Sequence, residues 1–168
     1  MSDKSVVQVA LGIGSNLNRR RHIQHAISRL RTGFGELLLS PVYRSPAAGF
    51  DGPEFFNLVC VLHTNLAVFD LQSSLKQIEH LEGRVRGSHG SLSRTLDIDI
   101  LFYGDANLRQ QGLDIPRAEI LEYAFVLRPL SDLLPDQEHP LERKSYLALW
   151  RKLAVNKPQL WLSDWMPA

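Results

Sequence analysis

Two aspartates separated by a single residue stand inside the clearest strand pattern of the chain. Asp97 and Asp99 lie in the segment 96–103, whose other residues are apolar or aromatic. Because side chains alternate along a strand, both carboxylates leave by one face and the apolar residues beside them by the other. Adjacent carboxylates repel each other, and Mg²⁺ removes that cost by binding one or two carboxylates together with substrate phosphates. The pair predicts a magnesium site that handles phosphates; the alternative is two solvated aspartates paired with Lys or Arg.

Arginines precede this strand. Arg84, Arg86 and Arg94 flank the polar loop Gly87–Ser93. Guanidinium groups fit phosphate oxygens, and arginines beside a dicarboxylate metal site are the components of phosphoryl transfer. The same arginines could simply neutralise the carboxylates of the strand and of the helix before it. The charge pattern leaves both interpretations open.

Other patterns indicate less chemistry. The segment Gly12–Leu17 begins like a dinucleotide fingerprint but has Leu17 at the third glycine position, and no P-loop motif is present. His22 and His25 lie three residues apart on a polar helix face without an obvious third ligand, so we expect solvated histidines rather than a metal site. We expect Cys60 to be an inert core residue. We expect the three tryptophans near the C-terminus to be packing anchors: Trp150, Trp161 and Trp165.

The elements that must position these residues follow a simple order. Strands are expected over 6–14, 36–44, 56–64 and 96–103. A helix capped by Ser15-Asn16 is expected to end at Gly33 and Gly35, and a second to end at Gly83. Their buried faces should carry Ile23, Ala26, Ile27 and Leu30 in the first helix, and Leu71, Leu75, Ile78 and Leu81 in the second. Short helices are expected around 119–123 and 145–153. The order predicts an α+β fold, a ferredoxin-like α/β sandwich with a mostly antiparallel sheet and flexible catalytic loops.

Composition bounds the class of protein. The chain has 168 residues without a linker or repeat, which predicts a single domain over 1–168. Its 19 basic and 18 acidic residues give a net charge of +1, so no global field favours nucleic acid or a membrane surface. One cysteine, no signal-peptide pattern and no apolar run near ~20 residues favour the cytoplasm. We expect a monomer.

Several motifs together carry a family resemblance. They are Gly14-Ser15-Asn16, Tyr43-Arg44-Ser45-Pro46, Phe55-Phe56-Asn57, Gly83-Arg84-Val85-Arg86 and the segment Ser93–Leu101 with its Arg-Thr-x-Asp-x-Asp-Ile pattern. In order, spacing and length the chain resembles the hydroxymethyldihydropterin pyrophosphokinase family from about Val6 to about Pro135. The resemblance implies ATP-dependent transfer of diphosphate to 6-hydroxymethyl-7,8-dihydropterin in folate biosynthesis, with AMP leaving.

The resemblance also implies roles for individual residues. Asp97 and Asp99 would hold two Mg²⁺ ions that bridge the ATP triphosphate, and Arg84 and Arg94 would contact the phosphates and stabilise the moving group. Further nucleotide contacts would come from Glu79, Ile100 and Arg117. The pterin would meet Ser45, Pro46, Phe55, Asn57 and Phe125, with Asn57 on its edge and Phe125 stacked on its ring. The loops 46–53 and 87–93 would close over both substrates.

Three departures fall on the nucleotide side. The family's usual Trp-Gly-Pro-Arg-Thr is Ser91-Leu92-Ser93-Arg94-Thr95 here, Arg117 replaces a common histidine, and Tyr123 replaces a common arginine. Alternatives therefore include a pyrophosphokinase for a modified pterin and a non-catalytic pterin-binding paralogue. An RNA-binding ferredoxin-like domain is disfavoured, because the chain lacks an aromatic RNP-type strand and a basic excess.

Overall fold

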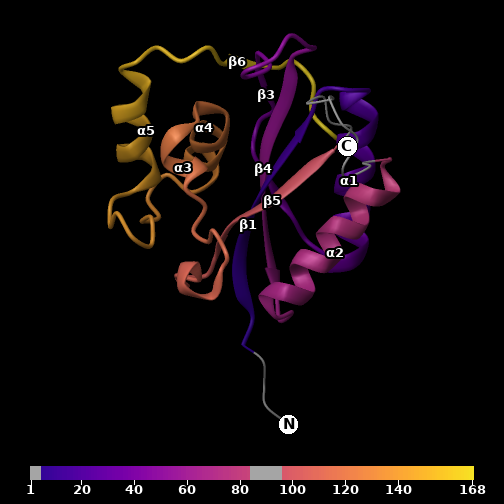
Figure 1. Ribbon diagram of the computed structural model, residues 1–168, viewed down its shortest axis with the longest axis vertical. Helices are drawn as coiled ribbons and strands as arrows, with labels where there is room; N and C mark the ends of the chain where they lie inside the picture. The colour runs from indigo at the N-terminus through magenta and orange to yellow at the C-terminus, as the bar shows by residue number, and fades with distance from the viewer. Residues whose placement is uncertain (1–4, 84–95) are drawn as a thin grey trace.

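The computed structural model describes residues 5–83 and 96–168. Its sheet has the strand order β5-β1-β4-β3-β6, and β2 also pairs with β4 (Figure 1). The strands are β1 (Val7–Ser15), β2 (Leu38–Leu39), β3 (Tyr43–Ser45), β4 (Phe55–Thr64), β5 (Asp97–Tyr103) and β6 (Trp161–Leu162). Every described pairing is antiparallel. The predicted antiparallel α+β architecture is confirmed.

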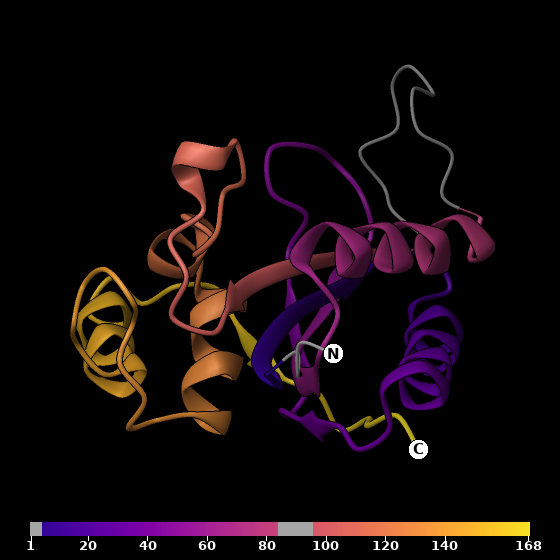
Figure 2. The same ribbon diagram turned by 90° about the horizontal axis from the view of Figure 1, so that it is seen from below.

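One face of the sheet is covered by α1 (Arg19–Phe34) and α2 (Val68–Leu81), as Figures 1 and 2 show. The predicted apolar positions of both helices are buried, with the exception of Leu81. Leu81 is 55% exposed, because it lies in the last turn of α2 and faces away from the core. The expected cap of α1 at Ser15-Asn16 is also wrong: the helix begins at Arg19, after Asn18 in the left-handed region at φ 45°.

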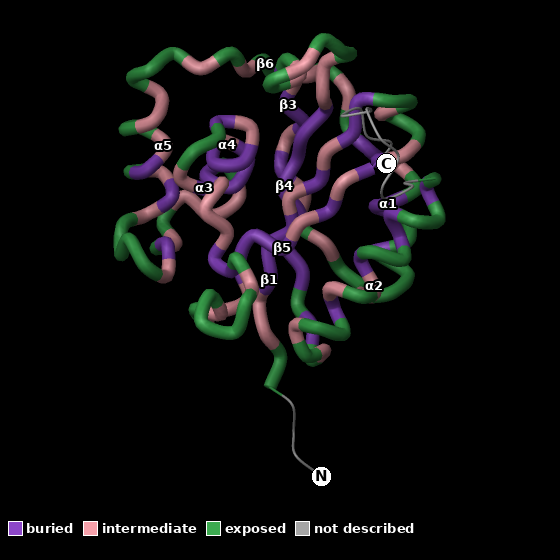
Figure 3. Tube along the Cα trace, in the orientation of Figure 1, coloured by how far each residue is buried: buried purple, intermediate pink, exposed green. Residues whose placement is uncertain are grey.

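The opposite face carries a second helical layer. It consists of α3 (Glu119–Glu122), α4 (Ala124–Leu133) and α5 (Tyr146–Ala154) (Figure 2). Val126, Leu127 and Leu130 of α4 pack with Val59 of β4 and Phe102 of β5 in a second hydrophobic core. The two-layer sandwich expected from the sequence is therefore extended to three layers, which explains why β4 is buried along nearly its whole length (Figure 3).

The second expected strand, 36–44, is interrupted in the structure. It divides into β2 and β3 at Ser40-Pro41, because proline has no N–H to donate to a ladder. Ser40, between β2 and β3, is hydrogen-bonded to β4. Its N–H donates to the Val59 carbonyl at 2.9 Å, and its Oγ accepts from the Val59 N–H at 2.8 Å. The residues of β3 consequently reach the end of the sheet at which β4 begins.

The C-terminal segment returns to the sheet after α5. Trp165 stacks on Phe56 at 5.7 Å between ring centroids, and Trp150 packs against the second core, so both are anchors as predicted. Trp161 is 43% exposed beside Arg44, and its predicted role as an anchor is wrong. Cys60 is fully buried, which raises the pKa of its thiol to about 12 and confirms an inert core residue. None of the described helices is long and apolar enough to cross a membrane.

Candidate active site

The two aspartates of β5 lie on the face that the alternation predicts. Ile98 and Ile100 are buried in the core under α1 and α2, whereas Asp97 and Asp99 point the other way. The neighbouring strand β1 places Gly14 opposite Asp97 and Gly12 opposite Asp99. Glycine has no side chain to crowd the carboxylates or the residues beside them: a Cβ at Gly12 would stand 3.2 Å from Leu101. The absence of side chains at Gly12 and Gly14 leaves room on this face of the sheet, where both carboxylates line cavities.

Two cavities of the described structure meet at these carboxylates. The first has a volume of about 250 Å³ and lies between α2, β5 and the segment 113–119. The second has a volume of about 320 Å³ and lies between the ends of β1 and β4, the segment 45–55 and the helices α3 and α4. Asp97, Asp99 and Glu119 line both cavities. This carboxylate group is called the shared wall below.

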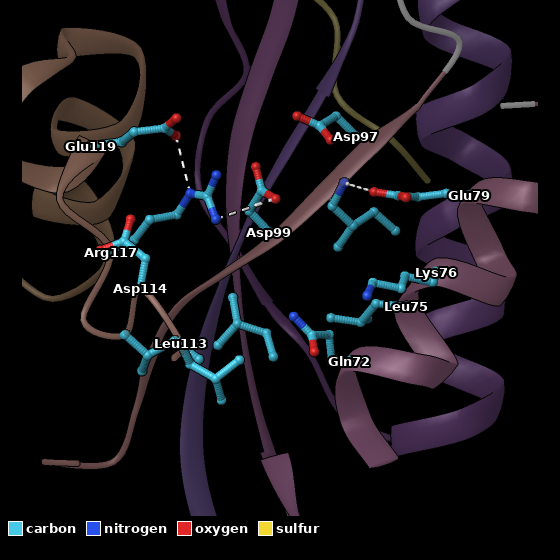
Figure 4. A pocket seen from close by; sticks show the side chains of 13 residues that line it. Gln72, Leu75, Lys76, Glu79, Asp97, Asp99, Leu113, Asp114, Arg117 and Glu119 are labelled. Carbon is cyan, nitrogen blue, oxygen red and sulfur yellow. Dashed lines mark hydrogen bonds and ion pairs between the residues drawn. The ribbon is translucent and has the colours of Figure 1, made fainter. Parts of the chain in front are cut away.

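The first cavity is acidic and contains the predicted nucleotide residues that the structure describes. Glu79, Ile100 and Arg117 line it (Figure 4). Glu79 is buried, and its Oε1 accepts a hydrogen bond from the Ile98 backbone N–H at 2.8 Å, which ties α2 to β5. The sequence interpretation missed Gln72, Lys76 and Asp114, which also line the cavity. The sequence signals that could have found them are the helical spacing of Gln72 and Lys76 from Glu79 and the position of Asp114 shortly before Arg117.

Arg117 lies against the shared wall. Its Nη1 is 3.6 Å from Asp99 Oδ1, and its Nε donates to Glu119 Oε2 at 3.2 Å (Figure 4). Burial and the neighbouring Asp97 nevertheless raise the pKa of Asp99 to about 7, although Arg117 acts in the opposite direction. Within the described residues, Arg117 therefore offsets the negative charge at Asp99 only in part.

This donor set fits a hard divalent cation that arrives with phosphates. Asp97 and Asp99 offer carboxylate oxygens, and a cation would remove their mutual repulsion. In the described part of the chain no group of three or more His, Cys, Asp or Glu side chains is arranged to hold a metal ion. Two protein carboxylates with ligands completed by a polyphosphate are the usual arrangement for Mg²⁺.

The second cavity collects the residues assigned to the pterin. Ser45, Pro46, Phe55, Asn57 and Phe125 all line it. Asn57 is buried on β4, and its amide donates to Ser45 Oγ at 2.9 Å and to the Tyr43 carbonyl at 3.4 Å. Its Oδ1 lies beside Gly14, where a Cβ would stand 3.5 Å away. The amide is thereby held in one orientation at the cavity.

Aromatic rings line the same cavity. Phe55 meets Phe50 edge to face, with 6.3 Å between centroids and 88° between planes. Phe125 stacks on Tyr123 at 5.0 Å and 14°. Phe50 was not singled out in the sequence, and Tyr123 entered only as a departure from the family pattern. The cavity combines apolar faces with a fixed amide, which suits a flat heteroaromatic ring with polar edges.

Some predicted residues are not placed. Arg84, Arg94 and Ser91, with the loop 87–93, lie outside the described residues. The expectation of solvated histidines is wrong for His22, whose side chain is only 13% exposed. His22 and His25 both donate to Glu82 Oε2, at 2.7 and 3.1 Å, and these bonds lower the pKa of Glu82 although its burial acts in the opposite direction. The cluster joins α1 to the end of α2.

The raised pKa of Asp99 predicts a gain in stability when its charge is removed. Between about pH 4 and 7 the unfolded chain has released this proton while the native chain keeps it, so wild-type stability falls as pH rises through this window. We expect Asp99→Asn to raise the melting temperature at pH 7.5, without divalent cations, by roughly 2–4 °C. The gain should shrink toward pH 4. A melting temperature equal to wild type at both pH values would contradict the raised pKa.

The sequence of the chain matches a known protein family. The family model for 7,8-dihydro-6-hydroxymethylpterin-pyrophosphokinase matches residues 10–135. The 2-amino-4-hydroxy-6-hydroxymethyldihydropteridine pyrophosphokinase of Pseudomonas aeruginosa is 42% identical over 144 residues, covering 80% of this chain and 85% of that protein. Its counterpart of the same name in Synechocystis is 34% identical over 142 residues, covering 83% and 72%. The folic acid synthesis protein fol1 of Pneumocystis carinii is 36% identical over 148 residues, but this chain covers only 20% of its length.

Solved structures give the same fold. A Plasmodium falciparum HPPK-DHPS variant superposes with a TM-score of 0.75 at 14% identity, over 92% of this chain and 47% of the other. The wild-type protein, solved with pterin and p-hydroxybenzoate, gives 0.72 over 93% and 44%. The chain thus spans less than half of these longer proteins. The match of residues 10–135 to the family model and the 42% identity to the Pseudomonas aeruginosa protein show that the chain belongs to the 7,8-dihydro-6-hydroxymethylpterin-pyrophosphokinase family, whose fold it shares.

Proposed function

We propose that the chain transfers a diphosphate from ATP to 6-hydroxymethyl-7,8-dihydropterin and releases AMP, a step of folate biosynthesis. The observation that carries the proposal is the shared wall: an acidic cavity and an aromatic cavity meet at Asp97, Asp99 and Glu119. Two substrates held in these cavities would present their reacting groups to each other across the carboxylates. Such positioning supplies a large part of the rate in reactions between two bound partners.

The proposed reaction is a direct transfer. The hydroxymethyl oxygen forms a bond with the β-phosphorus, the bond from that phosphorus to the oxygen bridging it to the α-phosphorus breaks, and AMP leaves with the bridging oxygen. The hydroxymethyl group loses its proton. A protein nucleophile is unnecessary, because the demands are alignment and neutralisation of phosphate charge.

The proposed nucleotide side rests on charge. Asp97 and Asp99 would hold two Mg²⁺ ions, which when bound neutralise the triphosphate and stabilise developing charge on its oxygens. Glu79, Ile100 and Arg117 form the remaining described wall of this cavity. Arg84 and Arg94 are proposed to contact the phosphates from the segment that follows α2.

The proposed pterin side rests on shape and hydrogen bonding. Asn57 would bond the polar edge of the ring with its Oδ1, while its amide nitrogen stays on Ser45 and Tyr43. Phe125 and Phe55 would cover the faces of the ring. Ser45, the last residue of β3, and Pro46 after it would close the cavity. These contacts orient the hydroxymethyl group toward the shared wall.

One observation favours a second candidate, a pterin-binding protein without transferase activity. Arg117 already pairs with Asp99, one of the two carboxylates assigned to the cations. A permanent pair would leave only Asp97 for the cation and would weaken or abolish transfer.

Formation of AMP separates the two candidates. Purified protein with ATP, Mg²⁺ and 6-hydroxymethyl-7,8-dihydropterin should release AMP in proportion to the pterin added, and removal of Mg²⁺ by EDTA should stop it. Omission of the pterin is the control for ATP hydrolysis. Pterin binding by calorimetry without AMP formation at any ATP concentration would contradict the proposal and support the second candidate.

The proposal includes two further points: the chain is a monomer, and it works in the cytoplasm, which the composition favours. Sedimentation velocity measures the first point: a single species near the 19.0 kDa of the chain is expected.

A further inference from the structure

Arg117 is held between two acidic groups of the shared wall. It contacts Asp99 through Nη1 at 3.6 Å and Glu119 through Nε at 3.2 Å. Its side chain is 28% exposed, so the contacts lie partly out of water, where ion pairs are screened less than on an open surface. Figure 4 shows the guanidinium between the carboxylates of Glu119 and Asp99.

The backbone fixes this arrangement without any ligand. The Arg117 N–H donates to the Leu101 carbonyl at 2.8 Å, so the segment after Ile115 is attached to β5 two residues beyond Asp99. The next residue is fixed as well, because the Ala118 N–H donates to the Asp114 carboxylate at 3.2 Å. The side chain of Arg117 thus starts from an anchored position and reaches back to Asp99.

A guanidinium tethered in this way is already a cation at the site. Arginine stays protonated at all working pH values, so its charge cannot be removed by loss of a proton. A divalent cation that binds Asp99 must displace this charge or share the carboxylate with it, and two positive charges at one carboxylate repel. Glu119 supplies a second acceptor on which the guanidinium can remain after it leaves Asp99.

We propose that Arg117 is an internal counterion of Asp99, which competes with divalent cations for that carboxylate and yields it when a nucleotide is bound. The inference rests on the assignment of Asp97 and Asp99 to the cation site in the proposed function. A polyphosphate offers Arg117 new acceptors and adds oxygen ligands for the cation. The free cation should therefore bind weakly, and the cation with its nucleotide well.

Binding of Mn²⁺, followed by electron paramagnetic resonance, tests this competition. Without nucleotide, Arg117→Gln should lower the Kd for Mn²⁺ by roughly tenfold, because the competing charge is gone. Arg117→Lys keeps the charge and should stay closer to wild type than to the glutamine variant. With ATP present and no pterin, the difference between wild type and Arg117→Gln should shrink to about threefold or less, since Arg117 has then left Asp99.

Arg109→Gln is the matched control. It removes the same charge from the same part of the chain, but Arg109 pairs with Asp114 at 3.8 Å rather than with Asp99. In ~0.1 M salt its effect on Mn²⁺ binding should stay within about twofold, because Arg109 is 43% exposed and its ion pair is with Asp114, which is not one of the two assigned cation ligands. An equal effect of the two glutamine substitutions would attribute the change to the general field of the cavity and overturn the inference.

Other outcomes are equally decisive. Equal Mn²⁺ affinity in wild type and Arg117→Gln would contradict the inference and would mean that Arg117 only stabilises the segment 113–119. Melting temperatures check folding, and Arg117→His, neutral at pH 8, gives the same comparison if the glutamine variant does not fold. If Arg117→Gln binds Mn²⁺ more tightly but the wild type forms no AMP, the inference on Arg117 stands and the proposed transfer is contradicted. If both proteins bind Mn²⁺ equally and the wild type forms AMP normally, the proposed transfer stands and the inference on Arg117 is contradicted.

Discussion

Replacing either Asp97 or Asp99 by asparagine will lower the rate of pterin-dependent AMP formation by about a thousandfold or more. Each change removes one carboxylate from a site whose charge balance requires both, and loss of a bound cation removes several kcal/mol of transition-state stabilisation. The measurement is kcat at saturating Mg²⁺ and ATP, with AMP quantified by chromatography. The expected loss should persist when Mg²⁺ is increased tenfold, because asparagine cannot restore the charge.

Asp105→Asn is the control for this loss. Asp105 is exposed and stands two residues after the end of β5, but it lines neither cavity. Its substitution should leave kcat within about twofold of wild type. Near-normal AMP formation in either of the two site variants would show that the carboxylate pair does not hold the cation.

Replacing Asn57 by alanine will weaken binding of the pterin by roughly 5- to 150-fold, the range that corresponds to 1–3 kcal/mol for an unpaired buried polar partner. The substitution removes the Oδ1 beside Gly14 and leaves the polar edge of the ring without its partner in a largely apolar cavity. Calorimetric titration with 6-hydroxymethylpterin measures the affinity. The Mn²⁺ affinity without pterin should stay unchanged, because Asn57 does not line the first cavity.

A second buried polar residue of β4 provides the comparison. Thr64 lies at the opposite end of the strand, and its Oγ1 accepts from the Leu66 N–H at 3.1 Å. Thr64→Val should reduce stability to a similar extent as Asn57→Ala but leave pterin affinity unaltered. If both variants lost affinity equally, the effect of Asn57 would come from loosening of the strand rather than from contact with the ring.

The parts of the fold that local pattern controls were predictable. Alternation along β5 gives the common face of Asp97 and Asp99, and helical spacing gives the buried face of α1. The described residues that the resemblance assigns to the nucleotide and to the pterin line two neighbouring cavities. The strand and helix faces depend on residues that are close to one another in the sequence. The cavity residues depend on short motifs that this chain shares with the family.

The remaining features depend on contacts that sequence patterns do not show. Pro129 interrupts the apparent pattern of α4, yet the helix forms because Val126, Leu127 and Leu130 cover the second face of the sheet. The burial of His22 results from its bond to Glu82, sixty positions away. Arg117 was expected to contact the nucleotide, and its position beside Asp99 depends on the attachment of its segment to β5, which the sequence does not show.

The shared wall has a thermodynamic consequence. Because the same three carboxylates border both cavities, a ligand that changes their charge or position in one cavity alters the binding free energy in the other. Linkage requires the effect to be reciprocal: if the cation–nucleotide pair changes the pterin Kd by some factor, the pterin changes the nucleotide Kd by the same factor. The total binding free energy must therefore be the same whether the pterin or the nucleotide is added first. The difference between the pterin Kd with and without the cation–nucleotide pair gives the coupling free energy that β5 transmits between the two cavities.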